Sequence, residues 1–334
     1  MKRTPRHLLT ALRNVSKLLG VDDRLRRLGL LAVGVLALGI AGAGSAYAAG
    51  PGPEVCANCH EAAVAYYKNS VHGQKGNARG PSNAGECSTC HGDGTAHVKA
   101  DGGRGVGGLK NPGGKSAMAS DEKSAICLTC HAGGSKRTHW DGSTHQARGN
   151  ACTSCHTMHT TDKVLTKITQ PDVCFNCHKQ QRAEVQRTFR HPILEGKVAC
   201  SDCHNPHGSI GKALMKRDSV VETCYQCHAE KRGPFVHSHE PVNEDCSICH
   251  NPHGTVADSM LKVRPPFLCH QCHTPHGGFV AQLRGQPGVV VGATTGGKTG
   301  VNFTQGRGCV NCHTQIHGGN NPAFTNPTPQ FMLR

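Results

Sequence analysis

The sequence predicts an elongated rod of short helices and irregular loops, with almost no β-structure. Three observations predict this fold class. Hydrophobic residues are 36% and aromatic residues 4% of the 334 residues, too few for the apolar cores that a soluble chain of this length usually builds. The 42 glycines and 18 prolines separate short segments, and no alternating strand pattern persists. The 20 cysteines and 24 histidines are foreign to a disordered chain, so a bound group must fill the interior.

The N-terminus has the layout of a secretory signal peptide over residues 1–48. Residues 1–27 are basic, residues 28–43 are apolar, and Ala46-Tyr47-Ala48 is a small-x-small site. Cleavage is therefore expected before Ala49, which leaves one exported domain over residues 49–334. An anchoring transmembrane helix is the alternative, but the apolar run is short for a membrane span and contains four glycines.

Every cysteine belongs to one of ten copies of the pattern Cys-x-x-Cys-His. This is the attachment sequence of c-type haem, in which the two thiols form thioethers with the porphyrin and the adjacent histidine binds the iron. The cysteines are Cys56, Cys59, Cys87, Cys90, Cys127, Cys130, Cys152, Cys155, Cys174, Cys177, Cys200, Cys203, Cys224, Cys227, Cys246, Cys249, Cys269, Cys272, Cys309 and Cys312. The proximal histidines are His60, His91, His131, His156, His178, His204, His228, His250, His273 and His313.

Paired cysteines also occur in zinc ribbons, thioredoxin-like dithiols and disulfide scaffolds. None of these has a reason to place a histidine directly after each pair. The pattern therefore predicts a multihaem cytochrome c whose chain packs around ten covalent haems c. The macrocycles then form the apolar interior that the side chains lack. Residues 49–334 contain 29 Lys+Arg and 20 Asp+Glu, a formal net charge of +9, and the haem propionates offset it. The basic composition therefore does not argue for a nucleic-acid partner.

The sixth iron ligand decides between an electron carrier and an enzyme. Thirteen histidines remain after the ten proximal ones and His7, whereas only five methionines follow the leader. Bis-histidine coordination throughout is therefore expected, which keeps the haem potentials low. The motifs group in pairs, with one histidine between the two motifs and another just after the second. The expected distal ligands are His72, His97, His145, His159, His191, His207, His239, His253, His276 and His317. His139, His237 and His270 are spares that compete with His145, His239 and His276.

The pairs of motifs predict five two-haem modules stacked in order, followed by a short C-terminal tail. Their approximate bounds are 54–97, 125–159, 172–207, 222–253 and 267–317. Several second motifs are followed by a histidine three residues past the proximal one, as His207 follows His204. Such a histidine cannot reach the opposite face of the same iron, so it is expected to bind a neighbouring haem and tie successive modules together.

Between the motifs, capping and proline signals predict three short helices. They are expected at Glu54–Asn69, Pro171–Thr188 and Val220–Lys231. The segment from Gly292 to Thr299 matches a phosphate-binding loop in its letters, but glycines follow it where such a loop needs a helix. No nucleotide is therefore expected as a partner, and that segment is interpreted as a loop.

The chain resembles the decahaem cytochromes of the MtrA/DmsE family, whose relatives include PioA and MtoA. The resemblance covers the whole chain after the leader. It rests on ten motifs in similar order, on the Cys-His-x-Pro-His-Gly repeats at 203–208 and 249–254, and on the ending from Gln305 to Gly318. The long basic leader, His270 inside its motif and Asn321 in the tail depart from the family pattern.

The resemblance implies bis-histidine haems in a near-linear chain, inserted into an MtrB-like outer-membrane β-barrel. In a bare rod the irregular backbone would expose N–H and C=O groups to lipid without hydrogen-bond partners. A surrounding barrel wall removes this energetic penalty. The expected function is an electron conduit between periplasmic or inner-membrane cytochromes and donors or acceptors outside the cell. In some members an outer-surface multihaem cytochrome completes the path. The alternatives are a soluble periplasmic shuttle or electron store, and a multihaem oxidoreductase with one open haem. The direction of electron flow is left open.

Overall fold

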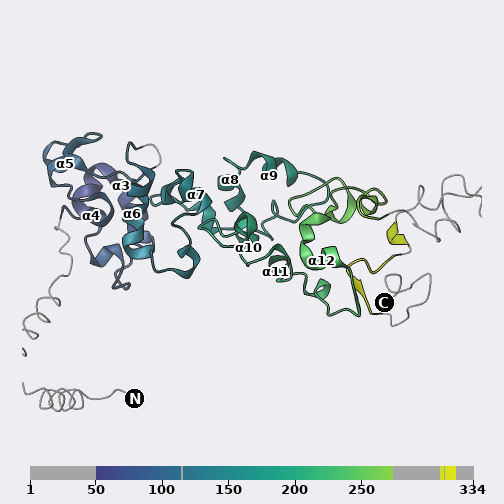
Figure 1. The fold of residues 1–334 in the computed structure, drawn as a ribbon. Helices are drawn as coiled ribbons and strands as arrows, with labels where there is room; N and C mark the ends of the chain where they lie inside the picture. Colours follow the sequence, from purple (N-terminus) through teal and green to yellow (C-terminus); the bar gives the residue numbers. More distant parts are fainter. Residues whose placement is uncertain (1–49, 114–115, 274–308, 312, 321–334) are drawn as a thin grey trace, which may run out of the picture.

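The computed structural model describes residues 50–113, 116–273, 309–311 and 313–320. The predicted leader, the phosphate-loop-like segment and Cys312 lie outside this part, as does His276. The described chain is elongated, and Figure 1 shows its colours passing from purple through green to yellow along the long axis. Position along the rod therefore follows position in the sequence.

Short helices supply nearly all of the regular structure. The α-helices are α3 (Pro53–Asn69), α4 (Cys87–His91), α5 (Thr95–Lys99), α6 (Ser120–His131), α7 (Thr144–Ala147), α8 (Gln170–Cys174), α9 (Lys179–Glu184), α10 (Cys200–Cys203), α11 (Val220–Cys224) and α12 (Glu240–Glu244). The 3₁₀ turns are η1 (Pro81–Asn83), η2 (Val106–Gly108), η3 (Ser135–Arg137), η4 (Cys152–Ser154), η5 (Lys163–Leu165), η6 (Lys212–Leu214), η7 (Ala229–Lys231), η8 (Cys246–Ile248), η9 (Asp258–Met260), η10 (Cys269–Gln271) and η12 (Cys309–Asn311).

Strand structure is confined, in the described part, to one pair of two-residue strands. β1 (His237–Ser238) lies antiparallel to β2 (Gly318–Gly319), with His237 opposite Gly319. This pair joins the fourth predicted module to the segment after the last motif. The expected fold class, short helices and loops with almost no β-structure, is confirmed.

The attachment motifs break the helices that the sequence predicts as continuous. α3 fills the first expected range, but His60 within it has a non-helical backbone (φ −119°, ψ 41°). The helix expected over 171–188 is wrong as a single element, because α8 and α9 are separated at His178 (φ −84°, ψ 66°). The same break at His228 separates α11 from η7. At these three histidines the backbone leaves the helical conformation, whereas α4 and α6 continue through His91 and His131.

The side-chain core of the described chain is small. Its one cluster of buried apolar residues comprises Phe175, Val185 and Ile193, with Leu194 and Val198 packed against it. No helix among the described residues is both long and apolar enough to cross a bilayer. Such a small apolar cluster agrees with an interior that a bound group must fill.

Candidate haem sites

The described parts of the attachment motifs are single turns, which lie within helices α3, α4 and α6 in the first three motifs. In seven motifs the backbone N–H of the histidine donates to the carbonyl of the first cysteine, as from His178 to Cys174, over 2.8–3.1 Å. The described cysteines are free thiols, not disulfides. The turn holds two thiols and one imidazole at one place, which is the arrangement that covalent haem attachment needs.

Nine proximal histidines of the described residues each face a second histidine. The ring centroids of these pairs lie 6.0–6.3 Å apart. The pairs, proximal residue first, are His60 with His97, His91 with His159, His131 with His72, His156 with His207, His178 with His145, His204 with His253, His228 with His191, His250 with His317 and His273 with His239.

The spacing of these rings fits an iron between them. With metal–nitrogen bonds of about 2 Å on each side, two imidazoles on one ion have centroids about 6 Å apart. A pair of imidazoles supplies two of six octahedral ligands, and a porphyrin supplies the other four. Among the described residues, no group of three or more histidine, cysteine, aspartate or glutamate side chains is arranged to hold a metal by itself. The residues present therefore fit a haem.

The structure pairs the nine expected distal histidines that it describes with proximal ones, and the tenth, His276, lies outside the described residues. At the contested positions, the ring facing His178 is that of His145, and the ring facing His273 is that of His239. The spares His139, His237 and His270 are not members of these nine pairs. The choice of partner across the rod could not be predicted from spacing, because several histidines lie at similar distances from each motif in sequence.

The pairs interlock the modules. The histidine between the two motifs of a module faces the first motif of the next module, as His145 faces His178. The histidine after the second motif faces the second motif of the preceding module, as His207 faces His156. Only His97 turns back within the first module, to His60, among the described pairs.

Burial favours the neutral form of several of these imidazoles. Desolvation is the largest cause that lowers the pKa of the ring from its ordinary value, and a nearby arginine or lysine adds to it at His131, His207 and His317. The residues concerned are His131, His159, His207, His239, His253 and His317. The neutral imidazole is the form that binds a metal, so the environment favours ligation.

The ring nitrogen that faces away from the partner is held in most pairs by a backbone carbonyl. Nδ1 lies 2.7–3.3 Å from a carbonyl oxygen in His91, His97, His145, His191, His204 and His250, on Lys110, Val106, Pro206, Pro252, Ala213 and Ser259 respectively. With Nδ1 donating, Nε2 carries the lone pair and points at the iron position.

Two of these carbonyls lie in separate loops that share the same unusual backbone conformation. Ala213 (φ 54°) and Ser259 (φ 56°) each have a left-handed backbone and stand nine residues after the proximal histidine they contact. Isolated bridges between His204 and Met215 and between His250 and Leu261 close the two loops in the same way. Each loop therefore adopts a strained backbone conformation that directs a carbonyl oxygen at Nδ1.

The glycine that ends the Cys-His-x-Pro-His-Gly repeats at 203–208 and 249–254 allows a close backbone approach. A Cβ at Gly208 (φ +108°) would collide with the carbonyl of His139, and one at Gly254 (φ +142°) with the carbonyl of Glu184. The repeat thus packs against the preceding module through its backbone. The contact gives His139 a structural place in the chain.

Cysteine contacts link all ten motifs in sequence order. Within each predicted module, the first cysteines of the two motifs lie close enough to perturb each other's pKa, in the pairs Cys56–Cys87, Cys127–Cys152, Cys174–Cys200, Cys224–Cys246 and Cys269–Cys309. Between modules, the second cysteines lie close enough to interact electrostatically, in the pairs Cys90–Cys130, Cys155–Cys177, Cys203–Cys227 and Cys249–Cys272. The contacts alternate between first and second cysteines along the rod.

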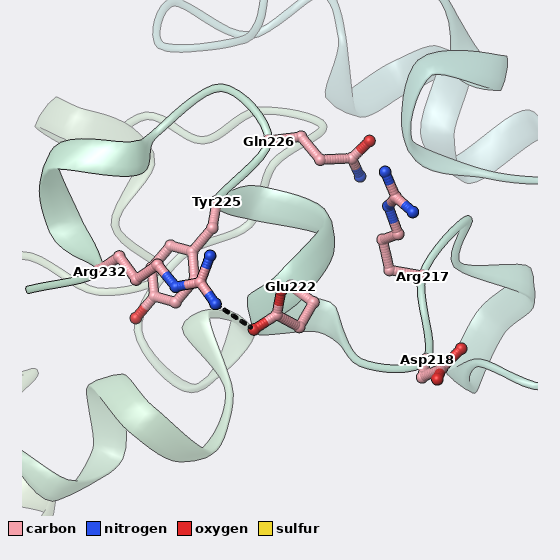
Figure 2. Close-up of a pocket in the computed structure, with 6 residues that line it drawn as sticks. All are labelled: Arg217, Asp218, Glu222, Tyr225, Gln226 and Arg232. Atoms are coloured by element: carbon pink, nitrogen blue, oxygen red, sulfur yellow. Dashed lines mark ion pairs between the residues drawn. The ribbon is translucent and has the colours of Figure 1, made fainter.

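A surface cavity of about 370 Å³ lies beside the seventh motif (Figure 2). Arg232 stacks over the Tyr225 ring at 5.9 Å and pairs with Glu222 at 3.6 Å, and Arg217 and Asp218 stand at the other side. Its two arginines are balanced by two carboxylates, so the cavity favours neither an anion nor a cation.

Repeated attachment turns, facing imidazoles and an interior with few apolar side chains define a multihaem c-type cytochrome. Two family descriptions agree: a doubled CXXCH motif matches residues 191–233 and 239–278, and a cytochrome c-type protein NrfB-like family matches residues 87–172. The chain is 41% identical over 276 residues to multiheme cytochrome MtrA of Shewanella baltica, covering 81% of this chain and 80% of that protein. It is 25% identical over 144 residues to cytochrome c-type protein NrfB of Escherichia coli, covering 35% of this chain and 76% of that protein.

The chain belongs to the MtrA family of multihaem cytochromes. It is accordingly an electron carrier that binds haem c through its Cys-x-x-Cys-His motifs, as the sequence predicts.

Proposed function

We propose that this cytochrome conducts electrons along ten haems, across the outer membrane, inside a porin-like β-barrel. All ten motifs would carry haem c on the cysteines and proximal histidines named above, and the ten distal histidines would complete the irons. The five two-haem modules are the repeating unit of this conduit. When bound, each haem supplies a one-electron couple between ferric and ferrous iron.

The observation that carries this proposal is the unbroken series of cysteine contacts. Each cysteine anchors one edge of a macrocycle, so neighbouring sulfurs hold the anchored edges of consecutive groups side by side. The series joins Cys56 in the first motif to Cys309 in the last along an elongated molecule (Figure 1). An enzyme or a storage protein has no need for such a single ordered path from end to end.

The histidines support conduction over catalysis. Two imidazoles for each iron leave no open position for a substrate, and the same two ligands suit both oxidation states. Nδ1 of His145 donates to the carbonyl of Pro206, and Nδ1 of His191 to that of Pro252, each 61 residues away in sequence. These bonds hold the rings in place, so electron transfer needs little rearrangement of the protein.

The leader and the family relationship support an outer-membrane setting. The basic segment, apolar run and small-x-small site of residues 1–48 favour export, with the mature protein in the periplasm. Its expected partners are an MtrB-like barrel, periplasmic or inner-membrane cytochromes that exchange electrons at one end, and in some settings an outer-surface multihaem cytochrome. Iron or another metal outside the cell is the expected donor or acceptor.

Reconstitution tests the proposal. The holoprotein and its barrel are placed in sealed vesicles that contain a reduced dye, and ferric citrate outside is the acceptor. Dye oxidation is expected only when both proteins are present. The paired variant Cys174→Ala/Cys177→Ala, which removes the fifth attachment site, should lower the rate to that of vesicles with the barrel alone. The exposed-site variant Asp141→Asn should keep the full rate.

Two results would contradict the conduit. Equal dye oxidation without the barrel would make the protein a shuttle, as would failure of the two proteins to co-purify. An unchanged rate in the paired cysteine variant would show that electrons bypass the chain of haems.

A further inference from the structure

We propose that two buried carboxylates, Asp162 and Glu184, lower the reduction potentials of the haems held at the fourth and sixth motifs. The inference rests on the axial histidine roles proposed above and adds two residues that lie outside the attachment pattern. Each carboxylate stands behind one imidazole of a facing pair, where other pairs of the described chain have a backbone carbonyl.

Asp162 holds the proximal histidine of the fourth motif. Its Oδ2 lies 2.7 Å from Nδ1 of His156, and its side chain is only 8% exposed. The other oxygen of the carboxylate accepts from the backbone N–H of Val164 at 3.4 Å, which orients the group. The ring of His156 lies parallel to that of His207, with 7° between the planes. The carboxylate, the imidazole and the iron position therefore follow one another in that order.

Glu184 holds the distal histidine of the sixth motif. Its Oε2 lies 3.3 Å from Nδ1 of His253, and its side chain is 9% exposed. Gln180 donates to the other oxygen at 3.0 Å. His253 faces His204, whose own Nδ1 contacts a backbone carbonyl. The sixth motif thus has a carboxylate on one side of the iron position and a carbonyl on the other.

The contrast with the remaining pairs is chemical. Six other histidines contact neutral carbonyl oxygens through Nδ1. A third carboxylate, Glu230, lies 3.7 Å from Nδ1 of His228, but both side chains are more than half exposed and the distance exceeds a hydrogen bond. Water screens that charge, whereas Asp162 and Glu184 are shielded from solvent.

Two effects act in the same direction. A carboxylate that accepts the Nδ1 proton makes the imidazole a stronger donor to the iron, which favours the ferric state. A buried negative charge also favours the more positive ferric ion, because the surrounding dielectric is low. Haem binding can only bury these carboxylates further. Both effects lower the potential of the haem concerned.

The position of the two sites gives the effect a consequence for conduction. The fourth and sixth motifs flank the fifth, near the middle of the rod. Haems of low potential there are the last to be reduced, so an electron must climb in energy to pass the centre. Electrons supplied at one end therefore collect on the haems of that end before they cross.

A redox titration of the holoprotein tests the proposal, followed by the low-spin haem signals in electron paramagnetic resonance (EPR). In Asp162→Asn and in Glu184→Gln, the contribution of one haem should move from the low-potential end of the titration to higher potential. The double variant should move two. Asp162→Glu, which keeps the carboxylate, should recover much of the wild-type curve. The signal of the shifted haem should itself change, because the donor strength of one axial imidazole has changed.

Asp141→Asn is the matched control. Asp141 is exposed and follows Trp140, whose ring contacts His207 of the same pair at 6.4 Å. It removes one negative charge from the same neighbourhood and should leave the low-potential end unchanged. A curve for Asp162→Asn or Glu184→Gln that coincides with this control would overturn the proposal for that residue. Loss of a haem from either variant would also overturn it, since the carboxylate would then be structural. Haem ligation itself is checked separately, by the low-spin state of the wild-type protein.

Discussion

His145 and His139 stand six positions apart, yet only the ring of His145 belongs to one of the nine facing pairs, where it lies 6.2 Å from that of His178. Removing His145 should leave one iron with an open or water-filled position. We expect His145→Ala to show a high-spin signal from one haem in EPR, whereas His139→Ala keeps every haem low-spin. The reverse result would exchange the roles of the two residues.

The left-handed backbone at Ala213 permits a second test at the residue scale. An L-residue in this region costs about 1 kcal/mol relative to glycine, and the exposed Ala213 side chain packs against little. Ala213→Gly should therefore raise the free energy of unfolding by up to about 1 kcal/mol in guanidinium titrations. Ala183→Gly, in the ordinary helix α9, should lower it by about 0.5–1 kcal/mol. Destabilisation by both glycines would contradict the strain.

Repetition along the chain is what made the histidines predictable. Ten copies of one motif, each with a further histidine at a regular place, predict the attachment turns and a set of distal candidates. Asp162 and Glu184 could not be predicted because no repeat contains them. Asp162 follows its proximal histidine by six residues, whereas Glu184 lies in α9 of the third predicted module and its partner His253 lies in the fourth. The carbonyl of Ala213 contacts Nδ1 of His204 in the same way, but a backbone group cannot be recognised from the identity of the side chain.

At the scale of elements, the relative orientation of facing rings separates the sites into two kinds. The planes are within 27° at the first, second, fourth, sixth, eighth and ninth motifs. They cross at 84°, 83° and 55° at the third, fifth and seventh. In these three the distal histidine lies between the two motifs of a predicted module, but His239 occupies the same kind of position and has nearly parallel rings.

This difference should appear in the EPR spectrum of the oxidised holoprotein. Parallel imidazoles split the iron d orbitals strongly and give ordinary rhombic low-spin signals. Crossed imidazoles leave two orbitals nearly degenerate, so their signals have a larger maximum g value and greater anisotropy. We expect the two classes together, with crossed rings in the minority. A spectrum that contains rhombic signals alone would contradict the ring angles.

The helices show why local propensity reaches only part of this fold. The proline at the start of α8 and the serine cap of α11 place both starts within a residue of the expected ones, and Ser219 accepts from the N–H of Glu222 at 3.1 Å. The ends were wrong because residues of good helical propensity continue through each motif. The attachment geometry overrides that propensity at His178 and His228, and propensity scales do not contain it.

Over the whole molecule, the pairing of histidines between modules predicts that each module needs its neighbours to complete its iron ligands. A chain that ends at residue 263 keeps eight motifs, but His250 loses His317 as its facing ring. We expect this truncated protein to carry seven low-spin haems and one high-spin haem in EPR, with haem counted on the same sample. His317→Ala in the full chain should open the same iron without truncation. Eight low-spin haems in the truncated protein would indicate self-sufficient modules.

In the exported protein proposed above, the pairing of histidines between modules also bears on maturation. The first site can close early, because His60 and His97 belong to the same stretch of chain. The second must wait for His159, and the fourth, sixth and eighth likewise wait for a histidine further along the chain. The third, fifth, seventh and ninth sites face a histidine that precedes their motif. Until that later histidine arrives, each of the second, fourth, sixth and eighth sites would hold an attached but half-ligated haem, open to oxygen and to other ligands. Among the described pairs, the last ligand to arrive is His317, which faces His250. A chain stalled in export before that point would keep a haem iron with an open position.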